Sequence, residues 1–205
     1  LETHESVLCL SLSSGLSGTY QAAAAAARLV DGARVRVVDT RQLSITLGLV
    51  VEAVGEAIAA GAGLDDAAAV AQSAARNTKL FATFPSLDTA ARGGRVSPAL
   101  ARVARLTGLK PLLSLDDDGR AEKAGAHLGF AAALRGVARR ARRYAAGRPV
   151  RLLIAHANAV GAAEYLAERL CRTFGTSEIP LVNLAAVLAA HTGPGAVGLG
   201  VRRLD

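Results

Sequence analysis

Residues 7–30 read VLCLSLSSGLSGTYQAAAAAARLV and place an apolar strand, a serine- and glycine-rich loop and an alanine helix in direct succession. Apolar residues alternate with serines over 7–13, which predicts a strand. Ser17 suits the N-cap of a helix that runs to Val30, because a serine hydroxyl accepts a hydrogen bond from a first-turn N–H. The loop also gathers hydroxyls and backbone amides. It is either a capped helix start or a pocket for a small anionic group.

The alternation of strands and helices continues along the chain. Predicted strands cover 34–39, 79–84, 151–158 and 179–184, and predicted helices cover 43–60, 64–77, 87–92, 98–106 and 160–174. The segment 110–127 is typical of two strands joined at Asp118-Gly119. This alternation predicts an α/β protein, and the hairpin predicts a partly antiparallel sheet. We expect two α/β domains, an N-terminal one over 1–78 and a C-terminal one over 79–205.

The composition excludes several classes of protein. Hydrophobic residues make up 51% of the 205 residues and aromatic residues 3%, so the core is aliphatic. No apolar stretch approaches the roughly 20 residues that cross a bilayer, and the first residues lack the basic segment of a secretory signal. Cys9 and Cys171 lie apart in apolar segments, which indicates small buried side chains in a reducing compartment. We therefore expect a cytoplasmic protein without a metal site.

Much of the formal net charge of +7 comes from the segment 134–151. Leu134, Val137, Ala141 and Tyr144 recur at helical spacing, and arginines occupy most of the remaining surface. A nucleic-acid-binding protein would use such a face for phosphate contacts. Because few aromatic residues are available to stack on bases, we favour a solvated face of an amphipathic helix.

Two further segments hold side chains suited to an anion. His191 precedes Gly193-Pro194-Gly195, a constrained turn in which the imidazole either donates to an anion or is merely exposed. Arg95 follows a double glycine in the segment GGRVSP, residues 93–98. Its guanidinium can bind a carboxylate or phosphate through two parallel hydrogen bonds, or it is a surface arginine on a structural turn.

Four stretches together resemble the DegV family of bacterial fatty-acid-binding proteins, the FakB-type partners of fatty acid kinase. They are SSGLSGTYQAA (13–23), VVDTRQLSITLGLVV (37–51), GGRVSPALARVARLTGLKPLLSLDDDG (93–119) and HTGPGAVGLGV (191–201). The resemblance implies a two-domain α/β fold with a tunnel for a long-chain fatty acid between the domains. A separate kinase then phosphorylates the bound acid to an acyl-phosphate, so the binding protein is not itself an enzyme. The implied partners are the acid, the kinase and, transiently, a membrane surface, without nucleic acid, cofactor or transmembrane segment.

The same resemblance implies how the carboxyl group is bound. Hydroxyl, imidazole and backbone donors surround it, because a buried carboxylate without partners is costly. The implied carboxyl-binding residues are Ser17, Gly18 and His191, and the implied head-group or phosphate contacts are Ser14, Arg95 and Lys123.

Two features depart from the family pattern. The early T-S-x-P-S motif is absent, and the chain contains no methionine and opens almost directly in a strand. We therefore expect that an N-terminal portion carrying this motif is missing. The family also has a K-x-R motif after the hairpin, whereas Lys123 is followed here by Gly125 and then His127. Either His127 substitutes weakly for the arginine, or phosphate is handled differently.

An enzyme is the main alternative. Ser17 and His191 would then act as a serine hydrolase pair, although the G-x-S-x-G pattern would need glycine where Thr19 stands. A basic nucleic-acid-binding protein that uses the arginine-rich segment is the other alternative.

Overall fold

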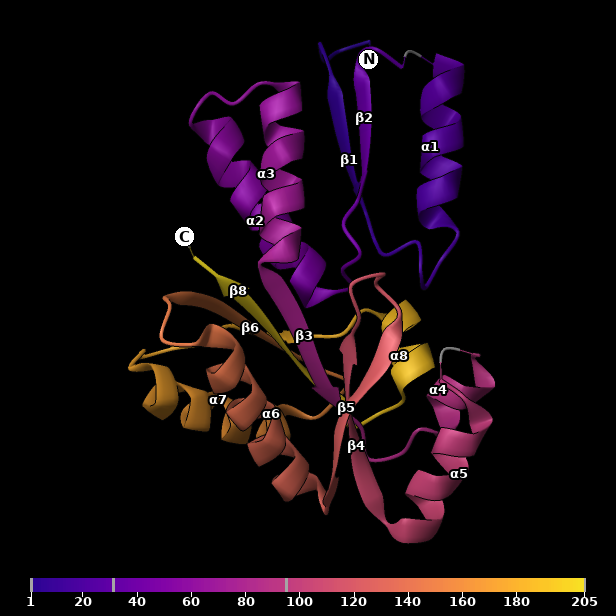
Figure 1. Cartoon of the computed structure of the whole chain (residues 1–205), viewed down its shortest axis with the longest axis vertical. Helices are drawn as coiled ribbons and strands as arrows, with labels where there is room; N and C mark the ends of the chain where they lie inside the picture. Colours follow the sequence, from indigo (N-terminus) through magenta and orange to yellow (C-terminus); the bar gives the residue numbers. More distant parts are fainter. Residues whose placement is uncertain (1, 31, 95, 205) are drawn as a thin grey trace.

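The chain forms two lobes, each built on its own sheet, in a computed structural model that describes residues 2–30, 32–94 and 96–204. The small lobe holds the two-stranded sheet of β1 and β2 with α1, α2 and α3 around it. The large lobe holds a six-stranded sheet and the remaining helices (Figure 1). The predicted α/β fold is confirmed.

The small lobe contains two parallel strands whose carboxyl ends lie at one edge. Its elements are β1 (Val7–Ser11), α1 (Thr19–Val30), β2 (Val35–Asp39), α2 (Ile45–Ala59) and α3 (Leu64–Arg76). Val7 of β1 pairs with Val35 of β2, and Val38 packs among buried alanines and valines of α2 and α3. Because the strands are parallel, the loops that follow them meet at the same end of the sheet, where open α/β sheets commonly bind ligands.

The large-lobe sheet has the strand order β5-β4-β3-β8-β6-β7. Its strands are β3 (Thr78–Thr83), β4 (Leu109–Leu115), β5 (Ala121–Leu128), β6 (Val150–His156), β7 (Leu181–Asn183) and β8 (Val197–Arg203). The hairpin predicted at Asp118-Gly119 is confirmed as β4 and β5. The sequence pattern predicts no strand over 197–203, yet β8 lies at the centre of the sheet between β3 and β6. Gly198 and Gly200 disfavour a strand by composition.

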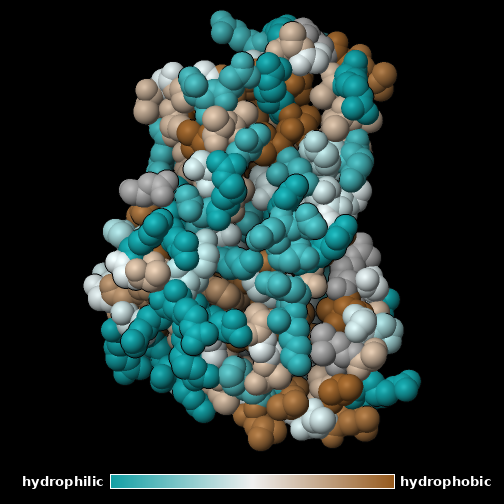
Figure 2. Space-filling view, in the orientation of Figure 1, coloured by the Kyte–Doolittle hydropathy of each residue, from teal (hydrophilic) through white to brown (hydrophobic). Residues whose placement is uncertain are grey.

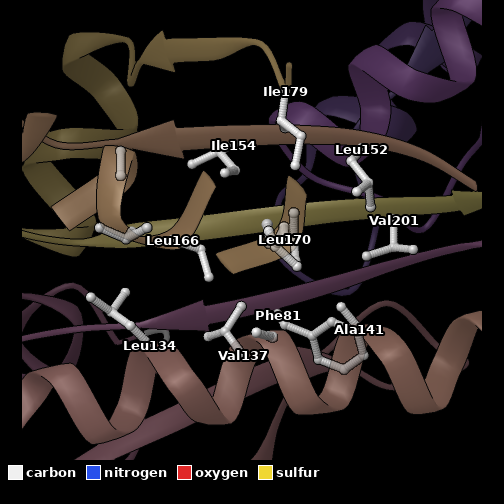
Figure 3. Packing of buried hydrophobic residues seen from close by; sticks show 14 of the residues in the cluster. Phe81, Leu134, Val137, Ala141, Leu152, Ile154, Leu166, Leu170, Ile179 and Val201 are labelled. Atoms are coloured by element: carbon white, nitrogen blue, oxygen red, sulfur yellow. The ribbon is translucent and has the colours of Figure 1, made fainter. Parts of the chain in front are cut away.

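Helices α6 and α7 cover one face of this sheet. The helices of the large lobe are α4 (Asp88–Arg92), α5 (Pro98–Thr107), α6 (Phe130–Ala145), α7 (Val160–Phe174) and α8 (Ala186–Thr192). Figure 3 shows Val137 and Ala141 of α6 next to Phe81 of β3, with Leu166 and Leu170 of α7 in the same core. Within the described part of the chain, no helix is long and apolar enough to span a bilayer.

The arginine-rich segment forms α6 and is amphipathic as predicted. Its buried side includes Leu134, Val137 and Ala141, while Arg139 and Arg143 are exposed. Hydrophilic residues dominate the corresponding lower left of the surface in Figure 2. The helix is therefore held by its apolar stripe, and its charged side faces solvent.

The small lobe packs on the opposite face of the large-lobe sheet through α2. Gly200 of β8 lies under this helix, where a Cβ would be 3.0 Å from Leu49 Cδ1 and 3.3 Å from Thr46 Cγ2. The glycines of β8 thus allow α2 to approach the strand closely.

A network of ion pairs reinforces the same contact between the lobes. Glu52 and Glu56 of α2 face Arg151 of β6 and Arg202 of β8, with N···O distances between 3.3 and 3.8 Å. Only 9% of the Arg202 side chain is exposed, whereas the other three partners are between 39% and 58% exposed. The network therefore pairs one buried arginine and one solvated arginine with two partly solvated glutamates.

Candidate functional site

Ser13 is the centre of the loop between β1 and α1, and it is fully buried. Its N–H donates to the Gln42 carbonyl at 2.9 Å and so ties this loop to the loop after β2. Its carbonyl accepts the N–H groups of Leu16 at 3.1 Å and Ser17 at 3.2 Å, and its hydroxyl oxygen accepts the Gly15 N–H at 3.1 Å. The loop is therefore folded around one serine at the carboxyl ends of the parallel strands.

The Asp39 carboxylate accepts the next backbone N–H along the loop. Its Oδ1 accepts the N–H of Ser14 at 3.1 Å and the N–H of Arg41 at 3.0 Å. The backbone N–H groups of residues 14–17 are thus all engaged within the small lobe. The Ser14 hydroxyl, rather than its amide, is the group that remains for a ligand.

The N-terminus of α1 offers donors that the loop does not use. The helix begins at Thr19, and the Ala22 N–H donates to the Gly18 carbonyl at 3.0 Å, so Gly18 takes the N-cap position predicted for Ser17. Ser17 Oγ lies 2.8 Å from Thr19 Oγ1 and accepts the Thr19 N–H at 3.3 Å. Among the residues described, none accepts the Gly18 N–H. This amide and the Ser17 and Thr19 hydroxyls lie at the positive end of the helix dipole.

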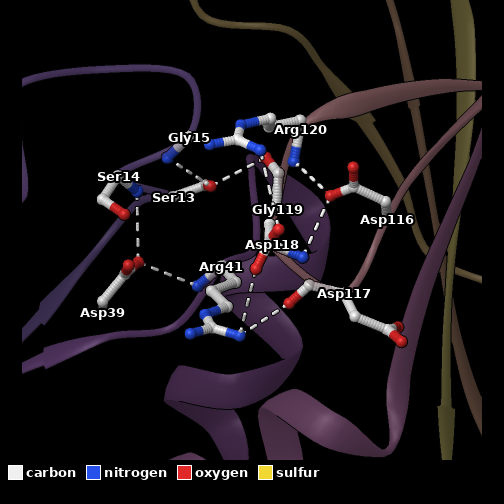
Figure 4. Close-up of polar contacts among 10 residues, drawn as sticks. All are labelled: Ser13, Ser14, Gly15, Asp39, Arg41, Asp116, Asp117, Asp118, Gly119 and Arg120. Atoms are coloured by element: carbon white, nitrogen blue, oxygen red, sulfur yellow. Dashed lines mark hydrogen bonds and ion pairs between the residues drawn. The ribbon is translucent and has the colours of Figure 1, made fainter.

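The tip of the β4–β5 hairpin, residues 116–120, lies against this loop (Figure 4). Ser13 Oγ donates to the Gly119 carbonyl at 2.7 Å, and Arg41 Nη1 donates to the Asp117 carbonyl at 2.8 Å. Arg41 and Arg120 also form ion pairs with Asp118 at 3.9 Å and 3.6 Å. The large lobe therefore contacts the small lobe at the loop that carries the predicted carboxyl-binding serine.

Lys123 and His127 lie on opposite faces of the large-lobe sheet because β5 contains an irregularity. Lys123 pairs with Leu113 and Gly125 pairs with Leu112, so the intervening residue has no partner of its own. Paired residues of antiparallel strands share a face, and an extra residue reverses the alternation that follows it. Lys123 is exposed on the Leu113 face, and His127 lies on the other.

His127 is covered by α6. A Cβ at Gly136 would overlap with the imidazole Nε2, so this glycine makes room for the ring. Burial lowers the pKa of His127, and the nearby charges of Arg139, Arg140 and Arg135 lower it further. Gly125, which stands at the arginine position of the family's K-x-R motif, lies on the same face as His127 and opposite Lys123.

His191 lies in the last turn of α8, ahead of a tightly packed turn. The Gly195 N–H donates to the Ala157 carbonyl at 2.7 Å, and a Cβ at Gly195 would lie 2.5 Å from Pro85 Cγ. Gly193 and Gly195 both have positive φ, 78° and 86°. The turn is thus fixed by its glycines, while the half-buried His191 forms no hydrogen bond with another described residue.

The predicted site residues form few direct contacts with one another in the described part of the chain. Within the described ranges no hydrogen bond joins Ser17 to His191, as a hydrolase pair would require. Lys123 forms no ion pair there either, and Arg95 lies outside the described residues. Ser17 belongs to the small lobe and His191 to the large lobe.

A cleft of about 1160 Å³ opens between the lobes. It is lined by the end of β2, by α3 and β3, and by the hairpin tip, with Asp39, Arg41, Lys79 and Asp117 among its polar groups. Ser17, Gly18, His191 and Lys123 are not part of its lining. Tyr20, in the first turn of α1, is part of the lining, so the cleft reaches the helix that begins directly after Ser17 and Gly18.

Comparison with known proteins gives the family of the chain. Residues 1–203 match the family model described as "Uncharacterised protein, DegV family". The chain is 35% identical over 198 residues to the DegV domain-containing protein SCO2569 of Streptomyces coelicolor, which covers 96% of this chain and 70% of that protein. The chain belongs to the DegV family, and the resemblance inferred from the motifs is confirmed.

Solved structures share the fold over nearly the whole chain. The DegV family protein Cg2579 of Corynebacterium glutamicum has a TM-score of 0.90 at 30% identity, covering 98% of this chain and 76% of that one. A DegV family protein of Thermus thermophilus, whose structure is described as showing fatty acid binding, has a TM-score of 0.90 at 33% identity. That match covers 99% of this chain and 72% of the relative.

Sequence reasoning missed the residues that support the loop. Ser13 lies in the first quoted motif, and Asp39 ends a predicted strand, but neither residue type reveals a partner far along the chain. The run DDDG at 116–119 signals the hairpin turn. Nothing in its composition indicates that the turn reaches the other lobe.

Proposed function

We propose that this protein binds a long-chain fatty acid and presents its carboxyl group to a fatty acid kinase, which forms the acyl-phosphate. The observation that carries the proposal is the relative from Thermus thermophilus, described as binding fatty acid, at 33% identity and a TM-score of 0.90. The protein would act in the cytoplasm as a carrier, and the chemistry would belong to the kinase.

The N-terminus of α1 supports the carboxyl-binding part of the proposal. Ser17 and Gly18 bring a hydroxyl and an unused N–H to the positive end of a 12-residue helix, and both groups can donate to a carboxylate. The Ser14 hydroxyl lies one turn earlier in the same loop. In this proposal His191 contributes from the large lobe, and Arg95 and Lys123 lie near the head group or the phosphate.

In this proposal the acyl chain lies at the boundary between the lobes. A cleft of about 1160 Å³ there has apolar side chains of both lobes in its lining, among them Val38 and Leu80. A hydrocarbon chain held in a tunnel at this boundary would be removed from water, which contributes about 0.8 kcal/mol per buried methylene.

Lipid extraction of the purified protein tests the proposal directly. Mass spectrometry should find co-purified long-chain fatty acid, and mixing the loaded protein with a fatty acid kinase and ATP should yield acyl-phosphate. A protein that carries no fatty acid, takes none up and supports no acyl-phosphate would refute the proposed function.

Variants of the head-group residues test the assignment of the site. Ser17→Ala and His191→Ala should each weaken fatty-acid binding by about 1–3 kcal/mol, because each removes a hydrogen bond to a charged group. Ser177→Ala, an exposed serine in the loop after α7, is the matched control and should bind like the wild type. Unchanged affinity in both head-group variants would reject this site.

A further inference from the structure

We infer that the hairpin tip, residues 116–120, positions the carboxyl-binding loop of the small lobe, with Ser13 and Gly119 as positioning residues. The inference rests on the proposed function, because the loop in question carries Ser14, Ser17 and Gly18. Ser13 and Gly119 contact no ligand in this account. They act on ligand binding through the conformation of the loop.

Ser13 links the loop to the tip through a single hydroxyl. That hydroxyl donates to the Gly119 carbonyl at 2.7 Å and accepts the Gly15 N–H at 3.1 Å. Because a hydroxyl rotates to suit its acceptor, the bond to Gly119 fixes which way its lone pairs point. Ser13 is fully buried, so no solvent is available to replace a lost partner. The turn at Gly15 to Ser17 thus depends on a carbonyl 106 positions away in the chain.

Two glycines allow the loop and the tip to touch. Gly119 has a φ of +73°, and a Cβ there would overlap with Ser13 Oγ and lie 2.9 Å from Arg41 Cβ. A Cβ at Gly15 would lie 2.8 Å from the Asp118 carbonyl oxygen. A side chain on either glycine would force the lobes apart or displace the loop, because one of the atoms it meets is backbone or buried.

Arg41 connects the tip to the loop by a second route. Its φ of 52° lies in the left-handed region, which non-glycine residues adopt only when neighbouring contacts hold them there. The guanidinium donates to the Asp117 carbonyl at 2.8 Å, and the Arg41 N–H donates to the same Asp39 oxygen that accepts the Ser14 N–H. The tip therefore braces the start of the loop twice, directly at Ser13 and at Ser14 through Arg41 and Asp39.

The arrangement couples ligand binding to the contact between the lobes. If the loop has its binding conformation only while the tip is engaged, then a bound carboxylate must favour the engaged state by the same free energy. The fatty acid would hold the hairpin tip in place, and withdrawal of the tip would release the acid.

The test compares two Gly→Ala variants of the full chain. Gly119→Ala places a methyl group against Ser13, whereas Gly129→Ala has a similar φ of +79° and meets nothing within 4 Å. The readout is the ratio of the affinities for palmitic acid and its methyl ester, measured by displacement of a fluorescent fatty acid. A general loss of folding weakens the binding of both ligands and leaves the acid-to-ester ratio unchanged. Loss of the positioned carboxyl site lowers this ratio. We expect it to fall by about tenfold or more in Gly119→Ala and to stay unchanged in Gly129→Ala.

If the Gly119→Ala chain does not fold, a second pair of less disruptive variants tests the inference. Ser13→Ala removes the linking hydroxyl, and Ser114→Ala removes another buried serine hydroxyl, one that donates to the Leu80 carbonyl at 2.7 Å inside the large-lobe sheet. Hydrogen exchange at the amides of residues 15–17 should accelerate in Ser13→Ala and stay as in the wild type in Ser114→Ala. The acid-to-ester ratio should fall in Ser13→Ala alone.

The outcomes separate the inference from the proposed function. A wild type that prefers the acid, together with Gly119→Ala and Ser13→Ala chains that keep this preference, would overturn the positioning role alone. An equal loss in the control variants would overturn it as well. A wild type that binds neither palmitic acid nor its ester would overturn the proposed function and the inference with it.

Discussion

Removing both carboxylates that face Arg202 should destabilise the protein by about 2–3 kcal/mol, because no other described residue forms an ion pair with this buried guanidinium. The variant is Glu52→Gln combined with Glu56→Gln. Arg202 Nη2 lies 3.7 Å from Glu52 and 3.8 Å from Glu56. At such distances and an effective dielectric constant of about 20, each pair attracts by about 4 kcal/mol before any solvation cost.

Because both carboxylates are partly solvated, the net contribution of each ion pair to stability is much smaller than this Coulomb attraction. The Glu52 and Glu56 side chains are 39% and 58% exposed, so water screens each pair to a net contribution of about 1 kcal/mol. Either single variant should therefore cost about 1 kcal/mol, because the remaining carboxylate still pairs with Arg202. The double variant should cost more than the sum of the singles, because only then is the buried charge left alone.

Urea unfolding followed by circular dichroism measures these free energies. Glu168→Gln removes the partner of the exposed Arg172 within α7 and should change stability by less than about 0.5 kcal/mol. Arg202→Met removes the buried charge itself and should cost less than the double glutamine variant. A double variant no less stable than Glu168→Gln would refute the reasoning, and so would a strictly additive one.

Three further predictions concern the core, the partly buried His127 and the C-terminal turn. Leu170→Ala should lower the free energy of unfolding by about 2–5 kcal/mol, because the side chain is fully buried. Leu181 is partly exposed, so Leu181→Ala should cost far less in the same urea titration. Equal losses would contradict the described core. Because burial and arginines lower the pKa of His127 in the folded state, the unfolded state binds more protons once the pH falls below about 6.5, so stability should drop there. His127→Gln should lose this part of the drop, and identical urea midpoints against pH in both proteins would argue against a lowered pKa of His127 in the folded state. Gly195→Ala should lower stability by more than about 1 kcal/mol, since φ is +86° and the new methyl group meets a proline ring. Gly147→Ala is the control, because Gly147 has a φ of +80° and lies in open space. A similar loss in Gly147→Ala would assign the effect to φ alone.

Local patterns predicted most of the elements. The alternation over 7–13, the helical spacing from Leu134 to Tyr144 and the Asp118-Gly119 turn each depend on neighbours in sequence, and each corresponds to an element of the structure. The central strand β8 was not predictable in this way, because its glycines are required by the close packing of α2 on the strand. A requirement imposed by a partner leaves little local signal.

The site was predictable only in part for the same reason. Ser17 and Gly18 stand at a strand-to-helix junction, which the sequence shows directly. The bond from Ser13 to Gly119 joins residues 106 positions apart, and no composition or spacing signals it. The motif residues Lys123 and His127 were separated by the pairing of β5 with β4, which depends on strand register rather than on residue type.

The unpaired residue between Lys123 and Gly125 determines how changes in strand length would act on β5. Deleting Ala124 would restore the regular alternation and leave Lys123, Gly125 and His127 with their present partners and faces. Deleting Ala126 instead, with the irregularity kept, would pair His127 with Pro111 and move it to the other face. His127 would then leave its place under α6, and Leu128 would take its position in the pairing. Insertions and deletions in β5 should therefore be rarer among functional variants than substitutions at the same positions.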